Sequence, residues 1–186
     1  MVSILALWLP ILAAGVIVFI ASSILHMLLP FHKGDYVKIQ NEDDVMEAMR
    51  KAGVQPGDYM MPHCSSPSAL KDPAVVEKFK KGPVAMLTIM PSGAPAMGGQ
   101  LVQWFFYCVL VSICAAYIAG RAVQPGAHYL SVFRFAGATA FFAYSLGLWQ
   151  DSIWYKKSWS TTLKNTFDGL VYGLLTGGAF GWLWPR

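Results

Sequence analysis

The stretch 163–184, LKNTFDGLVYGLLTGGAFGWLW, decides how this chain folds. Glycine recurs in it at every fourth position, and four residues advance an α-helix by about 400°, so these glycines form one stripe along a helix. They are Gly169, Gly173, Gly177 and Gly181. A helix of about 20 mostly apolar residues crosses a bilayer, and this stretch is that long. The pattern therefore predicts a transmembrane helix with a small-residue packing face.

The glycine stripe has two interpretations, and the sequence leaves both open. In one, the glycines pack tightly against another helix of the same chain. In the other, they form a face on which a second copy of the chain or another membrane protein docks. Both rest on the same physics, because lipid supplies no hydrophobic drive between helices and small residues let backbones approach closely.

The composition of the whole chain is that of a membrane protein. Of its 186 residues, 55% are hydrophobic and 13% are charged, against roughly 25% charged in soluble domains. The formal net charge is +4. Residues 30–99 contain equal numbers of acidic and basic residues, so the whole excess lies in the apolar remainder. Basic charge beside apolar stretches indicates membrane orientation and argues against nucleic-acid binding, which needs a clustered basic face.

Four apolar stretches predict the domain organisation. The first transmembrane helix occupies residues 1–29. A three-helix transmembrane region occupies 100–186, with spans at about 101–123, 129–150 and 163–184. Long uninterrupted apolar runs exclude a transmembrane barrel, whose strands alternate. The predicted fold is an all-α membrane protein with four transmembrane helices and a small α+β cytoplasmic loop domain, residues 30–99, between helices 1 and 2.

The loop 30–99 carries its own local signals. An acidic first turn after Asn41 as N-cap, and a stop at Gly53, predict one short helix. Residues 73–81 predict a second, which Gly82 and a following proline end. The apolar run 84–90 has the length of a strand, with residues 36–39 as a candidate partner.

The distribution of Lys and Arg predicts the topology. Four spans place both termini on one side of the membrane. The other side holds the 30–99 loop and the loop between the third and fourth spans, and it carries more basic residues. The positive-inside rule therefore places the 30–99 loop in the cytoplasm and the termini outside, in a multi-pass protein of the inner membrane.

Polar side chains within or beside the spans are candidate functional residues, because charge in a membrane is costly. They are His26, Arg134, Asp151 and Asp168. His26, Asp151 and Asp168 are expected at one level on the cytoplasmic side, where they would relay protons or hold a cation, or form a hydrogen-bonded group that fixes helix orientation. Arg134 lies toward the outer side, which favours a lipid phosphate or an internal partner other than Asp168.

A second candidate site lies in the loop. Met60, Met61, His63 and Cys64 offer thioether, imidazole and thiol donors, which suit Cu(I) or Zn. Their spacing is not that of a known metal motif, and the methionines alternatively cover apolar surface or the bilayer edge.

The predicted function is that of a structural or accessory component. The sequence contains no phosphate-binding loop, dinucleotide fingerprint, metalloprotease motif or serine-hydrolase motif, so it indicates no cofactor and argues against an enzyme. The expected partners are the lipid bilayer and another membrane protein or a second copy, docked through the glycine-striped helix. One alternative is a small transporter or channel formed by an oligomer. Another is a membrane-bound metal-handling protein or enzyme that uses His26, His63, Cys64 and Asp168.

Overall fold

The computed structural model describes residues 1–186 and is mostly helical, with one small two-stranded sheet. The chain divides into two compact units. The helical unit comprises Met1–Tyr36 and Ala96–Arg186, and the loop unit comprises Val37–Pro95. The segment 30–36, which the sequence assigned to the loop domain, therefore belongs with the long helices.

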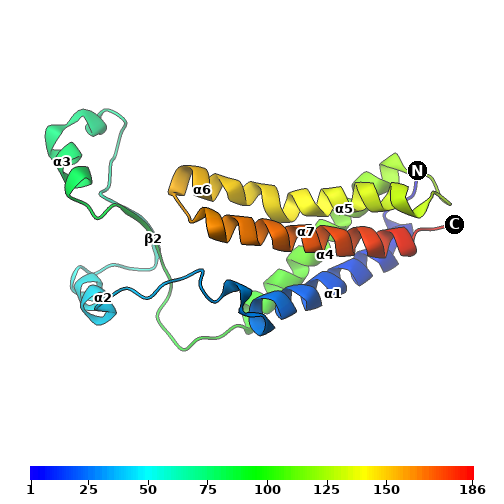
Figure 1. Cartoon of the computed structure of the whole chain (residues 1–186), viewed down its shortest axis with the longest axis horizontal. Helices are drawn as coiled ribbons and strands as arrows, with labels where there is room; N and C mark the ends of the chain where they lie inside the picture. The colour runs from blue at the N-terminus through cyan, green and yellow to red at the C-terminus, as the bar shows by residue number, and fades with distance from the viewer. The chain divides into compact units, whose positions relative to one another are not determined.

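Four long helices run side by side in the helical unit (Figure 1). They are α1 (Trp8–Ser23), α4 (Gly98–Ala122), α5 (Tyr129–Ser145) and α7 (Trp159–Trp182). A 3-10 turn, η1 (Leu5–Leu7), precedes α1, and a π-helical turn, η2 (Ile24–Leu28), follows it. After α5 come a 3-10 turn, η5 (Leu146–Leu148), and the short helix α6 (Trp149–Tyr155). Helical structure therefore continues to Tyr155, past the predicted end of the third span at residue 150.

Two helical segments are long and apolar enough to cross a membrane. They are Leu5–Leu28 and Gly98–Ala122, whereas the sequence predicts four spans. The other two long helices do not reach the same length and hydropathy: α5 has 17 residues, and α7 includes Lys164 and Asp168.

The helical unit buries small side chains and exposes large apolar ones. Alanines dominate its core, with Ala14, Ala115 and Ala136 fully buried. Leu5 is 87% exposed and Trp182 is 86% exposed. A water-soluble bundle distributes these residue types the other way round, whereas small residues between helices and large apolar residues outside are what a lipid environment favours.

The glycine stripe of α7 packs against α5 of the same chain. A Cβ atom on Gly173 would lie 2.9 Å from the carbonyl oxygen of Gly137, and one on Gly177 would lie 2.8 Å from that of Phe133. At Gly181 the same atom would meet the ring of Tyr129 at 2.7 Å. Only glycine permits this approach, so this face is occupied within the chain.

Hydrogen bonds join the two termini to the turn between α4 and α5. The Met1 ammonium donates to Gln124 Oε1 at 2.8 Å. The Trp184 indole donates to the Gln124 carbonyl oxygen at 2.9 Å, and the Gly126 amide donates to that of Pro185 at 2.8 Å. Both termini therefore lie at one end of the bundle, as Figure 1 shows.

The loop unit contains two short helices and one strand pair. They are α2 (Glu42–Lys51), α3 (Pro73–Lys81), β1 (Gly57–Met61) and β2 (Ala85–Ile89). The strands are antiparallel, with Gly57 opposite Ile89. Both predicted helices and the 84–90 strand are confirmed. No residue of this unit is buried, so its apolar faces are open.

Two details predicted for the loop are wrong. The strand partner is β1 and not 36–39, because β1 supplies a matching register in which the Thr88 hydroxyl donates to Asp58 Oδ1 at 2.6 Å. Residues 36–39 instead form the connection that leads to α2. Asn41 has left-handed backbone angles (φ 54°) and makes no side-chain cap, since an N-cap residue needs an extended backbone to reach the first amides.

Candidate metal centre

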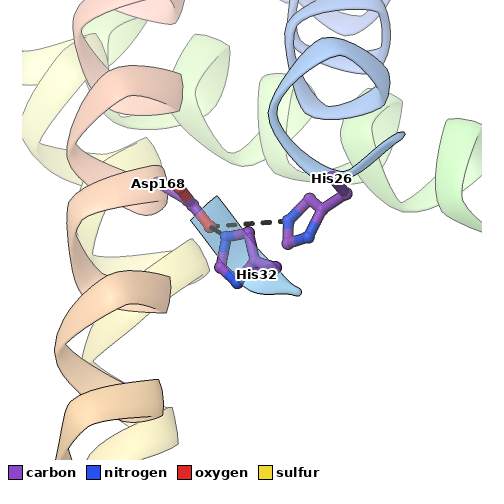
Figure 2. Close-up of side chains that lie close together, drawn as sticks. All are labelled: His26, His32 and Asp168. Carbon is purple, nitrogen blue, oxygen red and sulfur yellow. Dashed lines mark hydrogen bonds and ion pairs between the residues drawn. The ribbon is translucent and has the colours of Figure 1, made fainter. Parts of the chain in front are cut away.

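Asp168 stands at the centre of the most concentrated polar cluster in the helical unit. Its side chain is 3% exposed. Its Oδ2 atom accepts a hydrogen bond from His32 Nε2 at 2.8 Å and lies 3.4 Å from His26 Nε2 (Figure 2). A buried carboxylate needs such partners, because an unpaired charge in an apolar interior is very costly. Two imidazoles therefore converge on one carboxylate oxygen.

The backbone after α1 brings the two histidines together. His26 lies in the π-helical turn η2, and Leu29 then takes an extended conformation (φ −84°, ψ 143°). Pro30 begins a 3-10 turn, η3 (Pro30–His32), directly after the extended Leu29. The His32 ring consequently stacks on the His26 ring, with 4.2 Å between their centroids.

A second carboxylate holds the far side of the His32 ring. His32 Nδ1 donates to Asp35 Oδ2 at 2.6 Å, and Asp35 Oδ1 accepts from Lys164 Nζ at 2.7 Å. The Lys164 hydrogen bond, with a smaller contribution from His32, holds the pKa of the Asp35 carboxyl below its usual range although burial acts in the opposite direction. Lys164 lies on α7, four residues before Asp168, so the segment after α1 is tied to α7 at two points.

The geometry of these groups fits a metal ion. His26, His32 and Asp168 each offer one ligand atom, and the three atoms lie within 4.8 Å of one another. Tetrahedral bonds of about 2.0–2.1 Å place neighbouring ligand atoms about 3.3–3.4 Å apart. The His26–Asp168 distance of 3.4 Å already matches, and the His32–Asp168 pair would open by roughly 0.5 Å. No other group of three or more His, Cys, Asp or Glu side chains gathers in this way.

Asp35 gives His32 the orientation that metal-binding histidines have. A ligating imidazole almost always donates its second ring N–H to a carboxylate, a carbonyl or water, which fixes the tautomer and the ring plane. Here the Nδ1–Asp35 bond leaves Nε2 pointing at Asp168 (Figure 2).

The structure brings together two of the four polar residues predicted from the sequence. His26 and Asp168 meet, but Asp151 does not join them, because its carboxylate lies 3.8 Å from Lys157 at a partly exposed position. Arg134 is exposed and has no hydrogen bond or ion pair. It borders a small apolar depression beside Gly137 and Gly173.

His32, Asp35 and the role of Lys164 in the site were not predicted from the sequence. His32 and Asp35 follow Pro30, where the apolar stretch ends, and were treated as part of the loop. One signal was available: PFHKGD, residues 30–35, places a histidine and an aspartate directly after a span that itself ends in a histidine.

Three of the four candidate soft ligands of the loop border one cavity, and Cys64 does not. Met60 and Met61 belong to β1. The Cys64 thiol donates to the Ser66 carbonyl oxygen at 3.1 Å. The cavity that Met60, Met61 and His63 border is apolar and has a volume of about 530 Å³. A metal site at these residues stays a prediction.

Comparison of the chain with protein-family models, with curated proteins and with solved structures found no match.

Proposed function

We propose that this chain is an integral membrane protein that binds one divalent transition-metal ion through His26, His32 and Asp168. The observation that carries the proposal is the convergence of two imidazole nitrogens and a buried carboxylate oxygen within 4.8 Å. The Asp35 contact to His32 supports it independently, because it supplies the outer hydrogen bond that a ligating imidazole requires.

The donor set indicates the class of metal. Imidazole nitrogen suits zinc, copper, iron and nickel, and two histidines with one carboxylate recur in catalytic zinc sites and in non-haem iron sites. All three ligands bind a metal only in their unprotonated form. Three protein ligands leave at least one coordination position open, which distinguishes this set from a closed structural zinc site.

The same contacts also describe a metal-free state. With both ring nitrogens protonated, His32 donates to Asp35 and to Asp168 at once, and Lys164 balances the remaining charge. In that state the cluster would only fix helix positions. A measurement of metal binding distinguishes the metal site from this metal-free cluster, because a bound metal would replace the Nε2 proton of His32 and would take His26 as a further ligand.

Direct metal analysis tests the proposal. The full chain is purified without a polyhistidine tag, loaded with Zn²⁺ and dialysed. We expect one zinc per chain and a melting temperature that falls when a chelator is added, since a ligand at 100 times its Kd stabilises by about 2.7 kcal/mol. His32→Ala and Asp168→Asn should each lower zinc affinity by more than about a hundredfold, because the loss of a ligand costs more than the 10- to 100-fold caused by loss of an outer hydrogen-bond partner.

His63→Ala is the matched control for the metal experiment. It removes an imidazole from the loop unit and leaves the cluster intact, so it should keep the full zinc affinity. A wild-type chain that holds no zinc, or a His32→Ala chain that holds as much as wild type, would refute the metal site.

The membrane part of the proposal is a four-span arrangement in the inner membrane, with the termini outside and residues 30–99 in the cytoplasm. Its support is the exposed apolar surface of the helical unit, the pairing of both termini at one end, and the excess of basic residues on the loop side. The metal cluster, at the other end of α1, would then lie at the cytoplasmic end of the bundle.

Labelling of single cysteines in intact cells tests this arrangement. In a chain whose native cysteines are replaced, a membrane-impermeant thiol reagent should label a cysteine placed at Arg186 and should not label one placed at Lys78. The reverse labelling would invert the topology, and labelling of both without disruption of the membrane would contradict it.

A docking role is the second candidate function, and the loop unit favours it. No residue of this unit is buried, and its strand pair and α2 surround an apolar cavity of about 530 Å³. An apolar segment of another membrane protein would cover this surface. The glycine face of α7 is not available for docking, because α5 already occupies it. A photo-crosslinking residue at Met60 should capture one defined membrane protein from native membranes. The same photo-crosslinking residue placed at Glu77 serves as the control. The transporter or channel function stays a prediction from the sequence.

A further inference from the structure

A cavity of about 230 Å³ adjoins the metal cluster inside the helical unit. His26 and Asp168 form part of its wall, and His32 does not. The remaining lining residues are Trp104, Tyr107, Tyr144, Leu148, Asn165 and Tyr172. The open coordination position of a metal held by His26 and Asp168 would therefore face a partly open, largely aromatic pocket.

Three polar atoms on this wall are buried and have no hydrogen-bond partner. They are the hydroxyls of Tyr144 and Tyr172 and the Oδ1 atom of Asp168. Tyr144 is 7% exposed and Tyr172 is 3% exposed. Leaving such groups unpaired costs about 1–3 kcal/mol each, so the cavity is built for an occupant with polar atoms.

Two further polar groups of the wall already have partners. The Trp104 indole donates to Ser22 Oγ at 2.7 Å, and the Tyr107 hydroxyl donates to the Ala143 carbonyl oxygen at 3.1 Å. Their rings consequently serve as apolar surface. The donors that have no partner are the buried hydroxyls of Tyr144 and Tyr172 and the half-buried side-chain amide of Asn165.

The charge of the loaded site selects an anion. Asp35 and Asp168 with Lys164 leave the cluster at −1, and a divalent ion with neutral imidazoles takes it to +1. Burial in apolar surroundings makes that excess charge costly unless a monoanion balances it. A carboxylate does so, because it ligates the metal through one oxygen and accepts hydrogen bonds from the tyrosine hydroxyls through the other.

The size of the cavity and its aromatic rings select the rest of the ligand. An apolar protein cavity of about 150 Å³ accommodates benzene, so 230 Å³ holds a molecule of that size with one carboxylate. Aromatic walls favour an apolar body over an inorganic oxyanion, since rings gain from contact with other rings.

We propose that this cavity binds a small organic monocarboxylate, whose carboxylate completes the metal coordination and whose apolar body lies against Trp104 and Tyr107. This inference rests on the proposed metal-binding function. Tyr144 and Tyr172 are the residues that would recognise the carboxylate.

Ligand titration of the cobalt-loaded chain tests the proposal. Co²⁺ occupies the same nitrogen and oxygen sites as Zn²⁺, and its visible absorption reports its coordination. The full chain in detergent is loaded with Co²⁺ and titrated with benzoate. We expect a saturable change of the spectrum with one benzoate per cobalt, and weaker binding of acetate, which lacks the apolar body.

Variants of the tyrosines locate the carboxylate. Tyr144→Phe and Tyr172→Phe each remove one hydroxyl donor and should weaken benzoate binding by about fivefold, with Co²⁺ affinity unchanged. Tyr117→Phe is the matched control, because Tyr117 borders a different pocket beside the N-terminus and not this cavity, and it should bind benzoate as wild type does.

The outcomes separate the two proposals. Failure of Co²⁺ to bind is visible before benzoate is added and overturns both. A Co²⁺ spectrum that benzoate does not change, or benzoate binding that the Tyr144→Phe, Tyr172→Phe double variant retains in full, overturns the cavity ligand and leaves the metal site standing. Binding of benzylammonium to the metal-free chain in place of benzoate would also overturn it, since it would make the cavity a cation site of Asp168 and aromatic rings.

Discussion

The Nδ1 atom of His32 lies 2.6 Å from Oδ2 of Asp35, three residues further along the chain. This short contact settles how the imidazole ring is turned, because it commits one ring nitrogen to Asp35 and directs the other to Asp168 on α7. The bond to Lys164 then holds Asp35 itself in place. The orientation of a buried ligand is thus set by a residue that does not touch the metal position.

Asp35→Asn should reduce zinc affinity by about 10- to 100-fold while all three ligands remain, because outer hydrogen-bond partners of a ligating histidine have effects of that size. A competition titration with a zinc-binding dye measures the affinity. Asp151→Asn is the control, since that carboxylate pairs with Lys157 away from the cluster. Equal affinities for the two variants would show that Asp35 does not position His32.

Gly173→Ala should destabilise the bundle by about 1–3 kcal/mol, the cost of an overpacked contact. The added Cβ would lie 2.9 Å from a backbone oxygen of α5. Gly178→Ala adds the same atom at 3.7 Å from the nearest group, the Tyr129 hydroxyl, and should be neutral or stabilising by up to about 1 kcal/mol through helix propensity. Unfolding in SDS, followed by circular dichroism, compares the two. A Gly173→Ala chain as stable as Gly178→Ala would contradict the close α5–α7 contact.

Ser22→Ala should cost about 1–3 kcal/mol, because it leaves the indole N–H of Trp104 without its partner at 2.7 Å and so removes a link between α1 and α4. The neighbouring Ser23→Ala is the control. Ser23 bonds only to the Phe19 carbonyl oxygen of its own helix at 2.9 Å. Thermal unfolding in detergent should show the larger loss for Ser22→Ala, and similar losses would mean that the interhelical bond contributes nothing.

Thr162→Val should also destabilise the chain by about 1–3 kcal/mol, since it strands the buried Ser152 hydroxyl that lies 2.6 Å from Thr162 Oγ1 and joins α6 to α7. Thr139→Val removes a hydroxyl that bonds within its own helix, to the Phe135 carbonyl oxygen at 2.7 Å, and should change the stability less. Thermal unfolding in detergent compares the stability lost by the two variants.

The helical parts of the fold could be predicted because each depends on local pattern. Long apolar stretches marked the four helices, and the acidic first turn before Val45 and the proline at Pro73 marked α2 and α3. The spacing of the glycines predicted a close contact, although the sequence could not say that α5 would occupy it. The partner of β2 was predicted wrongly because strand pairing does not depend on local pattern. β1 and β2 are separated by more than 20 residues, and their register depends on contacts such as Asp58–Thr88.

One of the three candidate ligands, His32, could not be predicted from sequence patterns. His26 and Asp168 stood out because each is polar within an apolar stretch. His32 did not, because its position depends on the extended Leu29 and the 3-10 turn that follows it, after which its ring stacks on His26. Asp151 was placed with the cluster by its level along a span, but η5 interrupts the helix before it and its carboxylate turns to Lys157.

The π-helical turn at the end of α1 gives the centre an unusual sensitivity to chain length. In this turn the Leu29 amide donates to the Ile24 carbonyl oxygen at 3.1 Å, five residues back, so the turn holds one residue more than an α-helical turn would. Deleting a single residue between Ile24 and His26 would restore ordinary helical winding and rotate the histidine by about 100° around the helix axis, away from Asp168. A chain shortened in this way would keep its long helices and every ligand residue, and would still lose the arrangement that binds the ion.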